Sequence, residues 1–247
     1  MLINHNFLSP NYNNRSQRLE YIIVHFTEML FTDALEKLTD KTSEVSAHYL
    51  IKEDGEIYQL VDDSNIAWHA GKSSWYGSES LNQNSIGIEL DNLGNCEFKE
   101  DQILALIELS NFLVNKYNIP ANNFLAHSDI APDRKIDPGI FFDWELCAKN
   151  GLGIWHNLLT PKNSKILISF GDKNSSVKEL QKNLKKLGYM IHLSSAFDKQ
   201  TNFVVRAFQS KFYRELILQK GLGFYTNDAS QYSWCSFSEH ILQKLLV

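Results

Sequence analysis

The sequence predicts an α/β fold, in which a mixed β-sheet is flanked by helices, followed by a small all-α C-terminal domain. Short β-branched runs alternate with helical stretches as far as Gly153, an order typical of a sheet covered by helices. The composition then changes, because Thr160–Ser176 contains proline, glycine and many polar residues, as linkers do. Beyond this segment, apolar residues recur at helical spacing. We therefore expect two domains, residues 1–160 and 175–247.

The first predicted elements are a strand, a helix and a hairpin. Tyr21–His25 is a β-branched run typical of a buried strand that ends at a histidine. A helical stretch follows around Thr32–Lys41. Ala47–Lys52 and Glu56–Val61 then flank the sequence Glu53-Asp54-Gly55, which is typical of a hairpin turn.

Two more strands are predicted on either side of a long helix. Ile86–Leu90 indicates a buried strand with one carboxylate, Glu89, inside it. The helix begins at acidic residues, as helix N-termini favour, and its apolar positions fall near a 3.6-residue spacing at Ile103, Leu106, Ile107, Leu113 and Tyr117. Phe124–His127 is the last short strand, and it also ends at a histidine.

The C-terminal region contains two apolar stripes with helical spacing. The first stripe consists of Val177, Leu180, Leu184 and Leu187, and Gly188 follows it at the expected end of the helix. The second stripe consists of Val204, Phe208 and Phe212. They predict a small helical domain. The stretch from Gly221 to Val247 indicates only a final helix.

Composition excludes several classes of protein. The net charge of −5 argues against a nucleic-acid partner, because such partners usually require a basic face. Three scattered cysteines predict reduced thiols rather than a disulfide framework. No apolar run is long enough to span a membrane, and the N-terminus resembles no signal peptide, so we expect a cytoplasmic protein. An exported protein whose signal has been removed would have the same sequence features.

Two histidines and an aspartate are candidate metal ligands. His25 and His127 each end a predicted strand, where side chains can point toward a common place, and Asp137 follows in an irregular loop. Catalytic zinc commonly takes three such ligands and keeps a fourth position for water. The spacing alone does not establish a site, because there is no compact His-Glu-x-x-His motif. Each histidine is also compatible with a structural or exposed role, and the aspartate with a turn before Pro138.

Glu89 is a candidate general base. A carboxylate between Ile88 and Leu90 is costly to bury in its charged form unless it is paired or used. A role in deprotonating a metal-bound water would account for it. The alternative is a side chain that faces solvent from a half-exposed strand.

Several sequence blocks follow one another between about Tyr21 and Trp144. They are Ile22–Thr27, Ser46–Leu50, Ala67–Gly71, Ser85–Leu90 and Ala126–Gly139. Together, and in the same order, these blocks resemble the zinc amidases of the N-acetylmuramoyl-L-alanine amidase type 2 family, and in particular its AmiD and AmpD branch, where the third ligand is aspartate.

The resemblance implies one zinc ion per chain, with His25, His127 and Asp137 as its ligands. It implies that Glu89 is the acid–base residue and that Lys135 stabilises the oxyanion, although without the family Lys135 would be interpreted as a solvated loop residue. The expected reaction is hydrolysis of the amide bond between N-acetylmuramic acid, including its 1,6-anhydro form, and L-alanine in peptidoglycan fragments. The expected partner is the substrate, peptidoglycan or a muropeptide, and the sequence leaves the oligomeric state open.

Three further residues in or next to the matched blocks are expected to line the substrate groove: Trp68, His69 and Asn84. Trp68 has the shape to pack on a sugar ring or a peptide stem. For His48 and His69, a role as hydrogen-bonded framework residues is the alternative.

The C-terminal region contains a second set of recognisable segments between about Ser176 and Phe212. They are Val177–Gln181, Leu187–Tyr189, Phe197-Asp198, Thr201 and Val204–Gln209. These segments resemble the type 1 peptidoglycan-binding helical domain. The alternative is a helical appendage that only packs on the first domain.

Two rival functions also stay open, a peptidoglycan-binding protein without catalysis and a zinc peptidase that cuts within the stem peptide. Competent residues at every catalytic position favour the amidase.

Overall fold

The computed structural model describes residues 1–221 and 232–247, which form two compact units. The N-terminal unit comprises Met1–Ser73, Glu79–His127 and Asp137–Gly153. The C-terminal unit comprises Ile154–Val247 together with two short segments from earlier in the chain, Ser74–Ser78 and Ser128–Ile136. The compact units therefore interleave along the sequence, so that an early segment can belong to the later unit.

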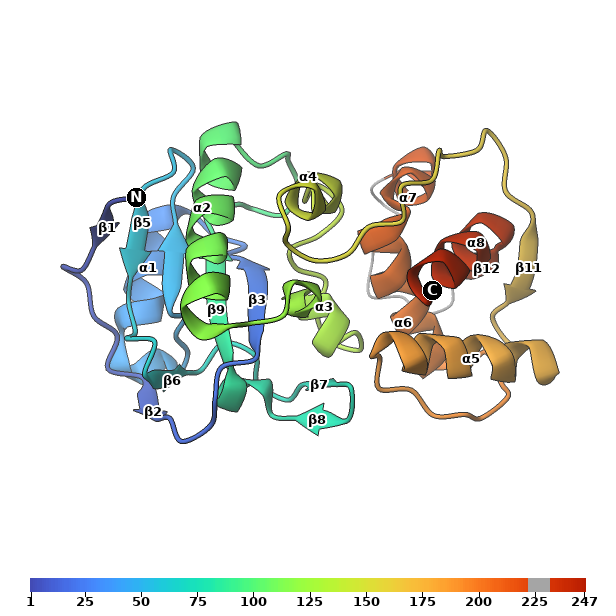
Figure 1. Cartoon of the computed structure of the whole chain (residues 1–247), viewed down its shortest axis with the longest axis horizontal. Helices are drawn as coiled ribbons and strands as arrows, with labels where there is room; N and C mark the ends of the chain where they lie inside the picture. The colour runs from blue at the N-terminus through green and yellow to red at the C-terminus, as the bar shows by residue number, and fades with distance from the viewer. Residues whose placement is uncertain (222–231) are drawn as a thin grey trace. The chain divides into compact units, whose positions relative to one another are not determined.

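The helices and strands follow one another along the chain as labelled in Figure 1. Up to Gly153 they are β1 (Ile3–Asn4), β2 (Tyr12–Asn14), β3 (Tyr21–Phe26), α1 (Phe31–Thr39), β4 (Tyr49–Ile51), β5 (Ile57–Gln59), β6 (Asn65–Ala67), β7 (Ser74–Trp75), β8 (Ser78–Glu79), β9 (Ser85–Leu90), α2 (Glu100–Tyr117), β10 (Phe124–Ala126), α3 (His127–Ile130) and α4 (Trp144–Lys149). Beyond it they are β11 (Ile166–Ser169), α5 (Ser175–Leu187), α6 (Lys199–Phe212), α7 (Arg214–Lys220), β12 (Ser233–Cys235) and α8 (Ser236–Leu245).

A six-stranded sheet forms the centre of the N-terminal unit, with the strand order β1-β5-β4-β9-β3-β10. Only the β4–β5 hairpin is antiparallel, and the other neighbours run parallel. The predicted mixed sheet with flanking helices is confirmed. The strands β3 and β9 at its centre consist almost entirely of buried residues, because parallel strands are covered on both faces.

Helices α1 and α2 lie on opposite faces of this sheet, and Figure 1 shows α2 in front of the strands and α1 behind them. Leu38 of α1 packs with Leu50 and Tyr58 of the sheet. Near the end of α2, Lys116 contacts the Asp63 carboxylate, and Tyr49 of β4 contacts the same group. Tyr49 directly precedes Leu50 in the strand, so its side chain points to the opposite face of the sheet. The apolar positions Ile103, Leu106 and Leu113 of α2 are buried, as the spacing predicts.

His48 lies at the centre of the N-terminal unit and links two segments of backbone. Its Nδ1 accepts a hydrogen bond from the Gly87 amide at 3.0 Å, so Nε2 is the protonated nitrogen that faces the Asn65 carbonyl at 3.1 Å. Burial, and then the nearby Arg15 guanidinium, lower the pKa of His48 from 6.5 to about 4. The imidazole is therefore neutral in the folded chain, as the framework interpretation of His48 requires.

This lowered pKa predicts that acid destabilises the N-terminal unit. Between pH 6.5 and about 4 the unfolded chain binds a proton at His48 that the folded chain does not, so the stabilisation is complete above pH 6.5 and is lost as the pH falls. The loss should be about 3 kcal/mol. Urea unfolding of the native protein and of His48→Asn over this pH range measures it, because the variant keeps an acceptor for the Gly87 amide but does not titrate. Equal pH slopes for the two proteins would contradict the prediction.

The C-terminal unit is helical, as predicted, with one addition. The two predicted stripes form α5 and α6, whose first turns are capped by the side chains of Asn174 and Asp198. The expected linker, however, contains β11, which pairs antiparallel with β12. This small pairing adds to the predicted helical domain, because the β-branched Ile166 and Ile168 in the linker favour a strand. The expected final helix is α8, and the part of that stretch at 222–231 lies outside the described residues.

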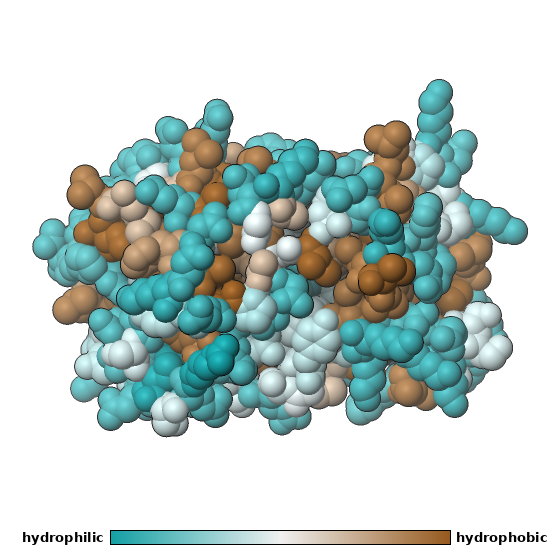
Figure 2. All heavy atoms as spheres, in the orientation of Figure 1, coloured by the Kyte–Doolittle hydropathy of each residue, from teal (hydrophilic) through white to brown (hydrophobic). Residues whose placement is uncertain are grey.

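Among the described residues, no helix is long and apolar enough to cross a membrane. In the face shown in Figure 2, exposed hydrophobic residues occur in small groups between hydrophilic ones. The three cysteines are free thiols, as predicted: Cys96 is exposed, and Cys147 and Cys235 are buried.

Candidate metal centre and active site

Register across three neighbouring parallel strands brings the main candidate residues together. His25 near the end of β3 is paired with Glu89 on β9. On the other side, Val24 is paired with Ala126 of β10, so His127 follows β10 at the level of His25. Paired residues of neighbouring strands point to the same face of a sheet. Glu89, His25 and His127 therefore form a row near the carboxyl ends of the strands, where α/β sheets commonly bind ligands.

Asp137 completes a compact group of three donor atoms with the two histidines. His25 Nδ1 lies 2.9 Å from His127 Nδ1 and 3.1 Å from Asp137 Oδ2, and His127 Nδ1 lies 2.9 Å from the same oxygen. All three residues are buried. Three donor atoms that face one point at these distances form a candidate metal centre, which we call the ligand triad.

The protonation of His127 suits a metal ligand. Its Nε2 lies 3.2 Å from the Ala70 carbonyl oxygen, which can only accept a hydrogen bond, so Nε2 is protonated. In a neutral imidazole the other nitrogen, Nδ1, is then without a proton and presents its lone pair to the triad. Metal-bound histidines typically have such a backbone partner for the second nitrogen.

The chemistry of the triad fits zinc. Two imidazole nitrogens and one carboxylate oxygen are a ligand set found in catalytic zinc sites. With ligand bonds of about 2.0–2.1 Å, donor atoms around a tetrahedral ion stand about 3.3–3.4 Å apart, a few tenths more than the separations here. An aspartate carboxyl is ordinarily ionised near neutral pH. The triad therefore contains an anionic ligand that is suited to a cation.

Lys135 lies in the other compact unit from the ligand triad. It belongs to the segment Ser128–Ile136, which groups with the C-terminal unit although it connects two residues of the triad. Its backbone carbonyl accepts a hydrogen bond at 3.0 Å from Arg206 of α6, and the Pro132 carbonyl accepts another at 2.6 Å. Arg206 is 1% exposed. A buried guanidinium thus holds the backbone of the segment that includes Lys135.

The same segment is held by a buried ion pair. Asp129 Oδ2 lies 2.6 Å from Lys211 Nζ of α6, and both side chains are buried. The Tyr189 hydroxyl donates to the other carboxylate oxygen at 2.8 Å. Burial, and then the nearby Asp129 charge, raise the pKa of Tyr189 well above its ordinary value, so this hydroxyl keeps its proton.

Two of the three expected groove residues have clear positions. His69 lies next to the ligand triad, with Nδ1 3.0 Å from His25 Nε2. Burial, and then the neighbouring His25, lower its pKa well below the ordinary value. Asn84 lies just before the start of β9, five residues from Glu89 and so about 16 Å away along the strand. There it donates to Glu20 at 2.9 Å, which indicates a structural role.

Trp68 is half-buried beside β6, and its indole nitrogen donates to Asn13 at 2.6 Å. This bond fixes the orientation of the ring. Its predicted contact with substrate stays a prediction.

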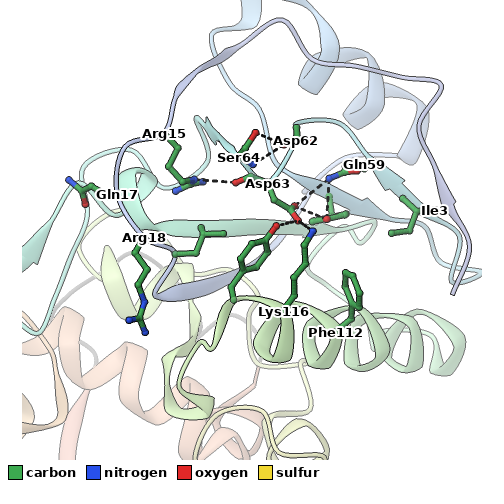
Figure 3. Close-up of a pocket in the computed structure, with 13 residues that line it drawn as sticks. Ile3, Arg15, Gln17, Arg18, Gln59, Asp62, Asp63, Ser64, Phe112 and Lys116 are labelled. Carbon is green, nitrogen blue, oxygen red and sulfur yellow. Dashed lines mark hydrogen bonds and ion pairs between the residues drawn. The ribbon is translucent and has the colours of Figure 1, made fainter.

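A separate pocket of about 510 Å³ opens elsewhere on the N-terminal unit (Figure 3). Its polar centre is Asp63, which accepts hydrogen bonds from Tyr49, Gln59, Lys116 and Tyr117. None of the residues that line it was predicted as a site residue. Since neighbouring side chains already use the carboxylate, this cluster stabilises the contact between α2 and the sheet.

Sequence reasoning missed several residues that hold individual candidate residues in place within their own unit. The Ser85 Oγ lies 3.1 Å from His69 Nε2, and Asp129 and Arg206 anchor the segment of Lys135. One signal was available for the first of these. Ser85, Gly87 and Glu89 alternate along β9 and therefore share the face that includes the site.

A buried ligand set of this kind, at the edge of a mostly parallel sheet, places the chain in the class of α/β proteins with a candidate metal centre. Comparison with known families is more specific. The family model described as N-acetylmuramoyl-L-alanine amidase matches residues 15–140, just over half of the chain. The chain belongs to this amidase family. A second model, named for peptidoglycan binding, matches residues 173–214.

Individual relatives support the same assignment. The chain is 42% identical to the N-acetylmuramoyl-L-alanine amidase AmiD of Escherichia coli K12 over 56% of this chain and 55% of the relative. It is 48% identical to the 1,6-anhydro-N-acetylmuramyl-L-alanine amidase AmpD of Citrobacter freundii over 40% and 54%, respectively. The matched region thus spans about half the length of these curated relatives.

A solved structure resembles the fold over nearly the whole chain. It is a complex of E. coli AmiD with the substrate anhydro-N-acetylmuramic acid-L-Ala-D-γ-Glu-L-Lys. The TM-score is 0.74 at 31% sequence identity, and the match covers 93% of this chain and 89% of that one. The predicted fold class and family are therefore confirmed.

Proposed function

We propose that the protein is a zinc-dependent amidase that hydrolyses the bond between N-acetylmuramic acid and L-alanine in peptidoglycan fragments. The observation that supports it most directly is the ligand triad of His25, His127 and Asp137 beside Glu89 on the neighbouring strand. Family membership supports the proposed type of bond, and the relatives' names and the ligand in the AmiD complex support the proposed substrate class, including its 1,6-anhydro form.

The proposed mechanism assigns a task to each residue. His25, His127 and Asp137 would hold one zinc ion, which acts as a Lewis acid and lowers the pKa of water in the site. Glu89 accepts the proton of the attacking water, whose oxygen forms the new bond to the lactyl carbonyl carbon of muramic acid. Glu89 then returns the proton to the nitrogen of L-alanine as the C–N bond breaks. The products are the muramic acid carboxylate and a free stem peptide.

Lys135 completes the proposed chemistry. Its ammonium group would donate a hydrogen bond to the oxyanion of the tetrahedral intermediate, where a fixed positive charge stabilises the developing negative charge. The bonds from Arg206 to the Lys135 and Pro132 carbonyls support this role, because they restrict the backbone from which the side chain extends. Trp68 is the remaining candidate for contact with the sugar or the stem.

The second candidate function is a peptidoglycan-binding protein without catalysis. The match of residues 173–214 to the model named for peptidoglycan binding supports glycan contact by the C-terminal unit. This function is compatible with the amidase, because a binding domain raises the local concentration of substrate. Without catalysis, however, it gives Glu89 and the ligand triad no role.

Metal removal tests the proposed function. The purified protein is stripped with a chelator, reloaded with zinc, and incubated with anhydro-N-acetylmuramic acid-L-Ala-D-γ-Glu-L-Lys. Mass spectrometry should detect free tripeptide with the zinc-loaded protein and none above background with the stripped one. The result is expected because the polarised water and carbonyl both depend on the metal.

The control variants separate the site from general effects. His127→Ala removes one ligand of the triad and should abolish product formation, whereas His5→Ala at an exposed histidine should leave it unchanged. An intact fragment that still binds zinc-loaded protein would favour the non-catalytic function. Cleavage within the stem would instead retain the metal site and overturn the choice of bond.

A further inference from the structure

His69 lies between His25 and Ser85, and both of its ring nitrogens have a partner in the protein. Nδ1 lies 3.0 Å from His25 Nε2, and Nε2 lies 3.1 Å from Ser85 Oγ. We propose that His69 is a positioning residue that fixes the tautomer of His25, so that His25 Nδ1 faces the metal without a proton. This inference rests on the metal site of the proposed function.

The direction of the hydrogen bonds is set at Ser85. Its Oγ lies 2.5 Å from the Leu81 carbonyl oxygen, which can only accept. The single hydroxyl proton of Ser85 is therefore donated to Leu81, and the lone pairs of Oγ remain for His69. His69 Nε2 must then be the protonated nitrogen that donates to Ser85.

The position of the proton on His69 also determines which nitrogen of His25 carries a proton. A neutral imidazole has one protonated nitrogen, so with its proton on Nε2, His69 presents a bare Nδ1 as acceptor. The partner at 3.0 Å, His25 Nε2, must supply the proton of that hydrogen bond. The remaining nitrogen, His25 Nδ1, is left with a lone pair directed at His127 and Asp137.

Gly87 shows that the His69 ring occupies a place built for it. A Cβ atom at position 87 would lie 2.3 Å from Cγ and 2.5 Å from Nδ1 of His69, closer than such atoms approach in proteins. The glycine therefore leaves space for the ring between Ser85 and Glu89, which point to the same face of β9. A ring fixed against the sheet in this way can impose a tautomer on its neighbour.

This interpretation changes the expected role of His69. The sequence predicted contact with substrate, with a framework role as the alternative. Since both ring nitrogens are used within the protein, the structure favours the alternative and makes it specific. The chain from Leu81 through Ser85 and His69 orients His25 as the outer partners of metal-bound histidines generally do.

Zinc affinity of the full-length protein tests the inference without any need for enzyme activity. Competition with a chromophoric chelator gives the zinc Kd of the native protein, His69→Ala, His69→Asn and Ser85→Ala. We expect His69→Ala to weaken zinc binding by about 10–100-fold, as loss of such partners generally does. His69→Asn should restore most of the affinity, because its amide oxygen can replace Nδ1 as an acceptor. Ser85→Ala should cause a smaller loss.

The tautomer itself is read by NMR of protein with ¹⁵N-labelled histidine. In the metal-free native protein, His25 is expected to carry its proton on Nε2, whereas Ser85→Ala and His69→Ala should show a mixture of both tautomers. A merely structural role for His69 would not alter this signal. Circular dichroism checks that each variant is folded, and His5→Ala at an exposed histidine is the matched control.

The outcomes separate the two proposals. If the native protein binds one zinc ion but the His69→Ala and Ser85→Ala variants bind it equally well with an unchanged His25 tautomer, the positioning role is overturned and the amidase stands. If the native protein binds no zinc at the triad, the metal site fails and this inference fails with it. Equal losses in His69→Ala and His69→Asn would show that ring volume, not the acceptor, is what matters, and would also overturn it.

Discussion

Replacing Glu89 by glutamine is expected to lower kcat by about 10²–10⁴-fold, the range that general acid–base catalysis contributes. Glutamine keeps the size of the side chain but cannot accept the proton of water or return it to the leaving nitrogen. Glu89 is paired in register with His25 and shares its face of the sheet, so the substitution acts next to the ligand triad without removing a ligand. Initial rates on a defined anhydro-muropeptide, with zinc-loaded protein, measure the effect.

Zinc stoichiometry decides how such a loss is interpreted. Glu89→Gln should still bind one zinc ion per chain, whereas His127→Ala should lose it. The matched control is Glu97→Gln, since Glu97 is exposed and belongs to no predicted site. A Glu89→Gln variant that keeps more than about a tenth of the native kcat would exclude Glu89 as the acid–base residue.

The second large effect concerns stability of the C-terminal unit. Lys211→Met should lower its free energy of unfolding by about 3–5 kcal/mol, because it removes the buried cation that pairs with the buried Asp129 carboxylate. The hydrogen bond from Tyr189 is kept in the variant, but a neutral hydroxyl does not neutralise the Asp129 charge. Hydrogen exchange of the α6 amides, followed with and without urea, reports the stability of this unit separately from the rest of the chain.

Two comparisons identify the cause of this loss. The double variant Asp129→Asn/Lys211→Met removes both charges and should recover much of the stability. Lys182→Met makes the same substitution in the same unit, but its partner Glu179 is exposed, so the change should stay within about 1 kcal/mol. Similar losses in Lys182→Met and Lys211→Met would show that burial of the ion pair is not the reason.

The elements of the sheet could be predicted because their signals are local. The run around Ile23 and the run around Ile88 became β3 and β9, and the acidic start at Glu100 became the first turn of α2. Each depends on periodicity and end preferences within a few residues. The strand β11 was missed, since its partner β12 lies more than 60 residues further along the chain. Pairing at that range leaves no signal in a short window of sequence.

Part of the site could be predicted because its residues also lie next to local sequence signals. His25 and His127 follow apolar runs, and the geometry of the triad agrees with the expectation that they meet Asp137. What supports them could not be predicted, because hydrogen-bond partners depend on how distant segments pack. The alternation along β9 placed Ser85 on the face of the site, but no pattern indicated that its partner would be His69, or that Arg206 would bind the Lys135 carbonyl.

The membership of the segment Ser128–Ile136 in the C-terminal unit has a consequence for evolution by gene recombination. A crossover near Gly153 that exchanges the C-terminal region also exchanges Lys211 and Arg206, but it leaves Asp129 in place. The hybrid protein would then bury the Asp129 carboxylate opposite a helix that had not been selected to place a basic residue there. Lineages that have acquired a different C-terminal domain should therefore have changed position 129 as well, and those that kept Asp129 should have retained a basic residue opposite it.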